Sequence, residues 1–137
     1  MAYVQNVPVR FDDVDYARIV YYPKLFSYCH WVFEDFFRKE LGIPYSEMLI
    51  KRQVGFPTVR AEADFKSPLR FGDICSVVME TTYLGRRTIT SAYRLELAGS
   101  GTVCAEAEIV TVSIDMGSFQ SVDMPEDVRA AFSRHLA

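Results

Sequence analysis

The spacing of hydrophobic positions changes along the first third of the chain. Apolar residues alternate with other residues between Val7 and Phe11, which predicts a half-buried strand ending at a cluster of aspartates. From Pro23 to Gly42 they recur every three or four positions, which predicts one long and very aromatic helix. Pro23 suits its first turn and Gly42 its end. Residues 42–51 then form a connector with a short helix.

The second half of the chain shows the two-residue period of strands. Apolar residues alternate from residue 59 to residue 65, and three further β-rich runs follow at residues 74–84, 88–97 and 102–114. Glycine-containing turn sequences separate the runs. We therefore expect tight hairpins to join them.

The order of these elements predicts the fold class. Near the C-terminus, Asp123 is expected to cap a short helix, with Glu126 completing a capping box. A strand, a long helix and four strands in hairpin succession indicate an α+β domain, with an antiparallel sheet against the helix. A helix this apolar is best buried by a sheet that curls around it, and one face of such a sheet often needs a partner chain. We expect residues 1–137 to form a single domain.

Composition narrows the classes of partner. The net charge is -3 and the pI near 5.4, which argues against a broad phosphate-binding surface for nucleic acid. No signal peptide and no membrane-spanning stretch is recognisable, so we expect a cytoplasmic protein that binds no membrane. Cys29, Cys75 and Cys104 are odd in number and far apart, which fits buried thiols better than disulfides or a metal site.

Candidate chemistry lies where the first strand gives way to the helix. In strand geometry, Asp13 and Asp15 would share one side while Asp12 faces the other. From spacing alone, all three are most often solvated turn residues or caps. The alternative is a reactive carboxylate beside the helix start, where free backbone N–H groups can bind a developing oxyanion. That combination suits acyl transfer.

The run from Phe11 to Pro23 reads FDDVDYARIVYYP. It resembles the signature of hotdog-fold thioesterases of the 4-hydroxybenzoyl-coenzyme A thioesterase type, including those of the YbgC kind. The likeness extends through the long helix, the segment with Pro68 and Gly72-Asp73, and the closing strands. It implies a hotdog fold, in which a five-stranded antiparallel sheet curls around one long helix, and a short helix follows at the C-terminus. It also implies hydrolysis of an acyl-coenzyme A thioester with an aromatic or short-chain acyl group.

The resemblance implies roles for individual residues. Asp15 is the expected nucleophile or general base, and the backbone N–H of Tyr22 the oxyanion donor. Arg86 and Arg87 match the paired arginines that hold coenzyme A phosphates, although two arginines in a hairpin loop are more often simply solvated.

Three further residues are expected substrate contacts, namely His30, Tyr28 and Phe56, although aromatic and histidine side chains on such a helix are more often core. No metal or cofactor is implied, because coenzyme A is part of the substrate. A homo-oligomer is expected, a dimer of hotdogs that pairs into a homotetramer.

Departures from the family pattern keep other interpretations open. Tyr16 and Arg18 replace the usual Pro and Gly, so the loop must accommodate a bulky charged side chain or turn it outward. His30 stands where the 4-hydroxybenzoyl enzymes use an aspartate, so a different acyl group is expected. The alternatives are a non-catalytic acyl-coenzyme A-binding module, or a hydratase or dehydratase. The second is weak, because His30 and His135 are the only histidines.

Overall fold

The computed structural model describes all of residues 1–137. Its strands and helices follow one another in the predicted order, with two very short strands added. The elements are β1 (Tyr3–Pro8), the 3-10 turn η1 (Phe11–Asp13), α1 (Tyr22–Phe36), the π-helical turn η2 (Phe37–Leu41), α2 (Tyr45–Ile50), β2 (Val54–Gly55), β3 (Thr58–Phe65), β4 (Ile74–Leu84), β5 (Thr88–Leu97), β6 (Val103–Val112), β7 (Ile114–Asp115) and α3 (Glu126–Ser133).

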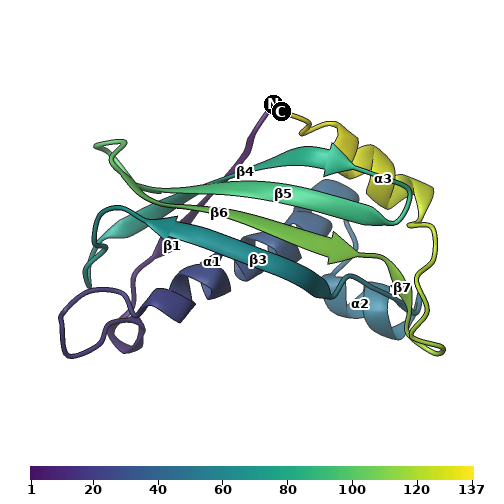
Figure 1. Cartoon of the computed structure of the whole chain (residues 1–137), viewed down its shortest axis with the longest axis horizontal. Helices are drawn as coiled ribbons and strands as arrows, with labels where there is room; N and C mark the ends of the chain where they lie inside the picture. Colours follow the sequence, from purple (N-terminus) through teal and green to yellow (C-terminus); the bar gives the residue numbers. More distant parts are fainter.

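One antiparallel sheet of five strands organises the molecule, in the order β1-β4-β5-β6-β3 (Figure 1). Strands β4, β5 and β6 are joined by tight connections, as their turn sequences predicted. β3 crosses over to pair with β6 and forms one edge of the sheet. The predicted α+β class and five-stranded antiparallel sheet are confirmed.

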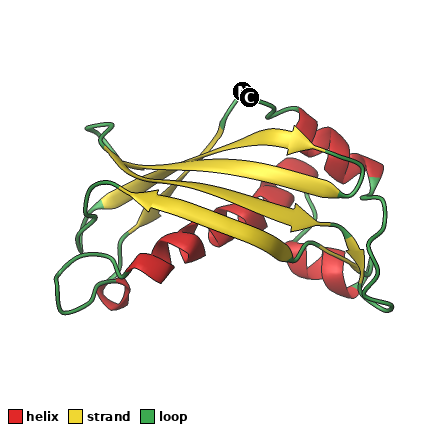
Figure 2. Ribbon diagram, viewed as in Figure 1, coloured by secondary structure: helices red, strands yellow, loops and turns green.

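Helix α1 runs along one face of this sheet, and the sheet curves over it (Figure 2). Its sheet-facing side is apolar and buried, which is the reason that a sequence with this three-to-four residue period forms a helix here. The predicted end at Gly42 is also confirmed: the helix widens into the π-helical turn η2, and Gly42 takes the left-handed conformation with φ 72°. The buried residues of α1 are Leu25, Tyr28, Cys29, Val32, Phe33 and Phe36.

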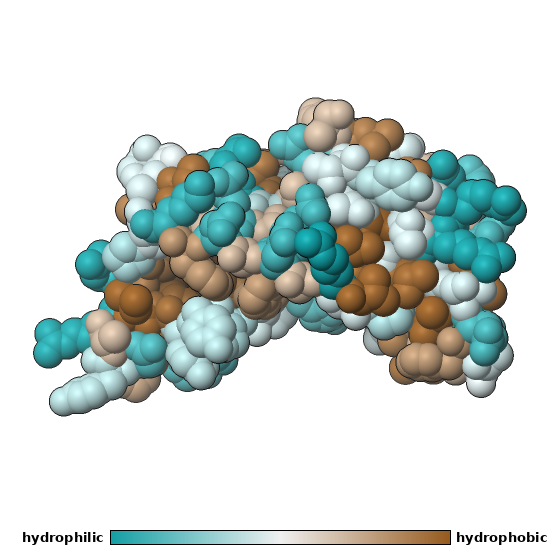
Figure 3. Space-filling model, viewed as in Figure 1, coloured by the Kyte–Doolittle hydropathy of each residue, from teal (hydrophilic) through white to brown (hydrophobic).

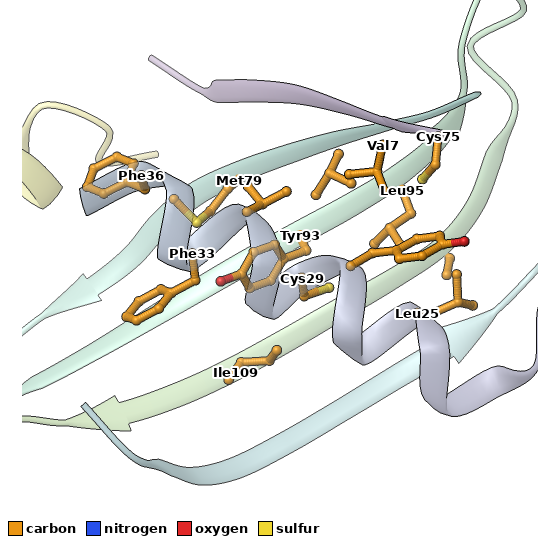
Figure 4. Close-up of a cluster of buried hydrophobic side chains, with 14 of the residues drawn as sticks. Val7, Leu25, Cys29, Phe33, Phe36, Cys75, Met79, Tyr93, Leu95 and Ile109 are labelled. Carbon is orange, nitrogen blue, oxygen red and sulfur yellow. The ribbon is translucent and has the colours of Figure 1, made fainter. Parts of the chain in front are cut away.

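The core lies between α1 and the inner face of the sheet (Figure 4). Phe36 is fully buried there, and its ring centroid lies 4.4 Å from that of Phe132 in α3. The three cysteines are buried and unpaired within the same core. Burial raises the pKa of the Cys75 thiol to about 12, so it behaves as a small apolar side chain.

The two chain termini meet beside α3 (Figure 1). The ring of His135 is buried, and its two nitrogens contact the Met1 carbonyl oxygen and the Glu40 carboxylate. The Thr81 N–H donates to the His135 carbonyl at 2.9 Å, which holds the C-terminus along β4. These contacts tie the chain ends to the far end of the long helix. None of the helices combines the length and the apolar character that crossing a membrane requires.

Two local predictions were wrong. The first strand spans Tyr3–Pro8 rather than residues 7–11, and Phe11 lies exposed in η1 because the chain leaves the sheet after Val9 bonds to Asp73. Helix α3 begins after Pro125, so Asp123 does not cap it. The Asp123 carboxylate instead forms charge-assisted hydrogen bonds with two arginines.

Candidate active site

Asp15 lies at the start of a short loop closed by a backbone bridge between Val14 and Val20. The Asp15 N–H donates to the Ile19 carbonyl at 3.1 Å, and the Arg18 N–H donates to the Asp15 carbonyl at 2.9 Å. Arg18 completes the turn in the left-handed region with φ 69°, and its side chain is exposed. The loop therefore accommodates Arg18 by turning its side chain outward, at the cost of a conformation that favours glycine.

The Asp15 carboxylate is exposed in the single chain. Its Oδ1 accepts a hydrogen bond from the Ala17 N–H at 2.8 Å, which fixes the side chain against its own loop. Oδ2 has no hydrogen-bond partner in the chain. Tyr16 beside it is 96% exposed, an unusual environment for a large aromatic side chain. The loop thus presents one carboxylate oxygen to whatever covers this surface.

Asp13 has the opposite environment, with only 2% of its surface exposed. Its Oδ2 accepts from the Tyr28 hydroxyl at 2.6 Å and from the Arg10 N–H at 3.0 Å, while Lys24 lies 3.9 Å from Oδ1. The expectation that Asp13 and Asp15 share one side was wrong, because η1 replaces strand geometry at this point. Asp13 is therefore the structural aspartate of the pair.

The start of α1 lies next to this loop. The Tyr21 N–H donates to the Asp13 carbonyl at 2.9 Å, and the Lys24 N–H donates to the Tyr21 carbonyl at 2.8 Å. Pro23 has no N–H, and the Tyr22 N–H, the first of the helix, has no acceptor in the chain. A free donor at the positive end of a helix can bind a developing oxyanion.

A cleft of about 360 Å³ opens between α1 and the sheet. Of the expected substrate contacts, His30 and Phe56 line it, and His30 pairs with Glu34 at 3.1 Å. Tyr28 does not: its side chain is fully buried on the sheet-facing side of α1, and its hydroxyl is bound to Asp13. The lining consists of Phe26, Ser27, His30, Trp31, Phe33, Phe56, Thr58, Ala61, Ser91, Tyr93, Ile109 and Thr111.

A second hollow of about 380 Å³ lies at the helix start, beside Tyr22. Its walls are mostly apolar and come from the loop before α1, from α1 and from the segment after β3, with the Tyr22 and Phe65 rings 6.0 Å apart. In the same view as Figure 1, Figure 3 shows apolar side chains at the surface below the sheet. The lining consists of Ile19, Val20, Tyr22, Leu25, Phe65, Lys66, Ser67, Pro68 and Leu69.

Arg86 and Arg87 lie in the β4–β5 hairpin and share one carboxylate. Arg86 Nη2 lies 2.7 Å from Asp123 Oδ2, and Arg87 Nε lies 2.9 Å from Asp123 Oδ1. These two arginines hold the pKa of Asp123 below its usual range. The backbone also fixes the hairpin, because the Arg87 carbonyl accepts from Ser113 and the Arg86 carbonyl from Met124.

The arginine pair and Asp15 lie at opposite ends of the sheet (Figure 1). Pro8, just before the Asp15 loop, pairs with Ile74 at the start of β4, whereas Arg86 follows the end of that strand. Eleven residues of strand span about 35 Å. One chain therefore does not bring these two predicted contacts to the same ligand.

Ser91 and Tyr93 are cleft residues that the sequence reasoning missed. They alternate with outward-facing residues on β5, so the two-residue period could have placed them on the inner face with Ile89 and Leu95. The sequence holds no signal that this face borders an open cleft.

Comparisons with known proteins show which family the chain belongs to. A family model described as the thioesterase-like superfamily matches residues 9–132. A 1,4-dihydroxy-2-naphthoyl-CoA hydrolase from Synechococcus elongatus is 31% identical over 119 residues, which cover 86% of this chain and 85% of that protein.

Solved structures agree as well. That of a 1,4-dihydroxy-2-naphthoyl-CoA thioesterase from Synechocystis superposes with a TM-score of 0.89 at 22% identity, over 97% of this chain and 96% of the other. That of a gentisyl-coenzyme A thioesterase gives a TM-score of 0.81 at 30% identity, over 93% of this chain and 99% of the other. The family match includes the Asp15 loop and both hollows along α1. The chain therefore belongs to the thioesterase-like superfamily and is a hotdog-fold thioesterase.

Proposed function

We propose that this chain hydrolyses an acyl-coenzyme A thioester to a free acid and coenzyme A, with Asp15 acting at the carbonyl carbon. The observation that carries the proposal is one short loop that places an available carboxylate oxygen beside a helix start with an unused N–H. The thioester oxygen accepts from the Tyr22 N–H, which stabilises the charge that develops as the tetrahedral intermediate forms.

Two routes lead to the same products. As a nucleophile, Asp15 forms a mixed anhydride while the carbon–sulfur bond breaks, and water then hydrolyses the anhydride. As a general base, Asp15 takes a proton from the attacking water, and the departing sulfur receives a proton. Label found in the protein carboxylate after a single turnover in isotope-labelled water would show the nucleophilic route, because label enters there only when water attacks the Asp15 carbonyl of the anhydride.

The acyl group that we propose is aromatic, with short-chain groups as the second choice. Aromatic side chains form much of the cleft wall, including Phe26, Trp31 and Phe56. The cleft starts at Phe26, four residues after Tyr22, which is about 6 Å along the helix axis. An acyl group whose carbonyl is bound at the Tyr22 N–H would therefore extend along α1 into the cleft.

We also propose that the working site combines two copies of the chain. Asp15 and the Arg86–Arg87 pair of one chain are about 35 Å apart along β4, which exceeds the reach of one coenzyme A molecule. If Arg86 and Arg87 of one chain bind the phosphates of a coenzyme A ester, the thioester of that molecule lies at the Asp15 loop of another copy. The outer edge of β3 has no strand partner, and Val59 and Phe65 on it are exposed, so a second copy pairing there would cover apolar surface. We propose a dimer of hotdogs that pairs into a tetramer.

A reducing compartment, the cytoplasm, is proposed for the enzyme. All three cysteines are free, and the buried thiols contribute to the core without any disulfide. Fractionation of the source cells with detection of the native protein tests the location.

A thiol-release assay tests the reaction and the role of Asp15 together. Aromatic, short-chain and long-chain acyl-coenzyme A esters are compared with the wild-type chain and Asp15→Asn. We expect aromatic esters to be cleaved fastest, and Asp15→Asn to lower kcat by about a hundredfold or more while binding is roughly kept. A folded wild-type sample that leaves every ester intact contradicts the proposal, and an Asp15→Asn enzyme at full rate removes Asp15 from the mechanism.

A complementation experiment tests the shared site. Asp15→Asn and the double variant Arg86→Ala/Arg87→Ala are each expected to have low activity at limiting substrate. When the two are unfolded and refolded together, mixed oligomers contain some sites with Asp15 and both arginines intact, so activity should recover in part. No recovery in oligomers shown to be mixed would contradict a site built from two copies.

A further inference from the structure

Arg18 lies in a strained backbone conformation, and no contact of its side chain offsets the strain. Three non-glycine residues have a positive φ, namely Arg18, Gln53 and Phe119. The Gln53 side chain donates to the carbonyls of Leu49 and Ile50 and so completes the end of α2. Phe119 lies in the turn after β7, at the other end of the sheet (Figure 1). Of the three, only Arg18 lies beside a proposed reactive group.

The Arg18 guanidinium has no partner in the chain. Its side chain is exposed and forms neither a hydrogen bond nor an ion pair, although Asp15 lies three positions before it. Arg70, which follows the Leu69 carbonyl that accepts from the Val20 N–H, is exposed and unpaired as well. Positive charge is therefore available at this loop. Most of the other arginines are held in ion pairs, namely Arg38, Arg52, Arg60, Arg86, Arg87 and Arg94.

The loop places Arg18 on the side of the proposed carbonyl site that faces away from the cleft. The Arg18 N–H donates to the Asp15 carbonyl and closes a turn, so their Cα atoms lie within about 7 Å of each other. Phe26, where the cleft begins, follows Tyr22 in α1, whereas Arg18 precedes it. With the acyl group in the cleft, the sulfur and the coenzyme A arm leave toward the loop.

The hollow beside Tyr22 provides a path for that arm. It has a volume of about 380 Å³ and mostly apolar walls, and one of its wall residues is Ile19, the neighbour of Arg18. The loop projects at the end of the molecule (Figure 1), with Tyr16 almost fully exposed. The pantetheine part of coenzyme A is uncharged and suits such a hollow. The first charged group beyond it is the diphosphate, which then reaches the surface near Arg18.

We infer that Arg18 binds the diphosphate of the coenzyme A ester whose thioester lies at Asp15 of the same chain. The inference rests on the proposed acyl-coenzyme A hydrolysis, which it deepens. A guanidinium donates two parallel N–H bonds to phosphate oxygens, and strained residues are retained where they serve a ligand. Arg86 and Arg87 of another copy then bind the third phosphate, which is on the ribose.

Arg18→Gly is the variant that tests this contact. It removes the guanidinium, and glycine adopts the positive φ without strain, so the variant should fold and be at least as stable as the wild type. KM for the coenzyme A ester should rise about three- to tenfold with kcat unchanged, and the difference should shrink at high salt. Arg38→Ala is the matched control: it removes an exposed guanidinium from the far end of the long helix, and KM should not change.

A series of three substrates with the same acyl group identifies the phosphate. The esters of coenzyme A, of dephospho-coenzyme A, which lacks the ribose phosphate, and of pantetheine, which lacks all phosphates, are compared. The KM ratio of Arg18→Gly to the wild type should be equal for the first two esters and fall to one for the third. A ratio that persists with the pantetheine ester overturns the inference, and so does one that is already one with either nucleotide ester.

A binding test separates this inference from the proposed reaction. Calorimetry with dephospho-coenzyme A and with pantetheine needs no turnover. Dephospho-coenzyme A should bind about three- to tenfold more weakly to Arg18→Gly than to the wild type, whereas pantetheine should bind alike to both proteins. If that difference appears while no ester is cleaved, the proposed reaction fails and the diphosphate site stands. If esters are cleaved but dephospho-coenzyme A binds alike to both proteins, the diphosphate site fails alone.

Discussion

Asp13 and Asp15 are separated by one residue, yet the structure uses them in opposite ways. The carboxylate of Asp13 is buried, its Oδ2 accepts hydrogen bonds from a tyrosine hydroxyl and a backbone N–H, and a lysine lies 3.9 Å from its Oδ1. The carboxylate of Asp15 is exposed, with one oxygen bound to Ala17 and the other free. An exposed carboxylate with an unpaired oxygen fits the reactive role proposed for Asp15, whereas the contacts of Asp13 hold the loop in place.

The Asp13 contacts explain how that support works. Through Tyr28 the carboxylate is tied to α1, and through its carbonyl Asp13 accepts from Tyr21, the residue before the helix. The loop and the helix start are therefore fixed to each other at two points. Asp13 therefore helps to hold the Asp15 loop against the start of α1.

Replacing each aspartate by alanine is the test of these two roles with the largest expected effect. Asp13→Ala removes the acceptor of the buried Tyr28 hydroxyl and of the part-buried Arg10 N–H, and we expect the free energy of unfolding to fall by about 3 kcal/mol. Asp15→Ala lies at an exposed loop, and we expect a change within about 0.5 kcal/mol. Urea unfolding of both variants measures the difference. Equal losses of stability would contradict the division of roles.

Tyr28→Phe tests the same contact from the helix side. The variant keeps the ring and removes only the hydroxyl that donates to Asp13, so we expect a loss of about 1–2 kcal/mol of stability. A double-mutant cycle with Asp13→Asn measures the coupling, which should be about 1 kcal/mol. Additive effects would show that the 2.6 Å contact contributes nothing of its own. Burial, with the hydrogen bond to Asp13 adding to it, raises the pKa of Tyr28, so the hydroxyl stays a donor across the usual pH range.

The helices and strands were predicted well because the apolar residues on their buried faces recur at regular spacings. The long helix, its end at Gly42 and the three hairpin strands all follow from spacing and turn residues. The side of the helix that faces the sheet was harder to predict. Neighbouring helical residues differ by about 100°, and the aromatic face is broad, so Tyr28 was placed in the cleft wall when Ser27 and His30 face the cleft.

The remaining misses depend on contacts between residues far apart in the chain. The inward direction of Asp13 is set by Tyr28, fifteen residues later. Asp123 has the sequence signature of a helix cap, but Arg86 and Arg87 reach it from 37 and 36 positions away. Local pattern describes neither pairing, because each exists only once the sheet has brought the segments together.

Arg18→Gly tests how much the backbone conformation of the Asp15 loop costs in stability. Arg18 has φ 69°, a conformation that costs a residue with a Cβ about 1 kcal/mol relative to glycine. The substitution should therefore raise stability by roughly 0.5–1 kcal/mol, less the greater freedom of glycine in the unfolded chain. Thermal unfolding measures the gain, and Arg38→Gly, on the helical side of the molecule, serves as a contrast that should lose stability. A loss in both variants would show that the Arg18 side chain makes a stabilising contact.

Asp123→Asn carries the smallest expected effect and extends the comparison to a third carboxylate, one that is neither buried nor free. The arginines lower its folded pKa, so its contribution to stability is present above the pKa of the unfolded chain, near 4, and is lost as pH falls through the lower folded value. Near neutral pH the variant should unfold at only a slightly lower temperature than the wild type, because the backbone still fixes the hairpin, and the difference should vanish in acid.

If Arg86 and Arg87 bind coenzyme A phosphates, removing the Asp123 charge that competes for them should lower KM by about two- to fivefold with kcat unchanged. Asp127→Asn, which breaks the separate pair with Arg52, should leave KM alone. A KM that rises in Asp123→Asn would mean that the carboxylate orients the arginines for the phosphate, so that in this respect it resembles Asp13 more than Asp15.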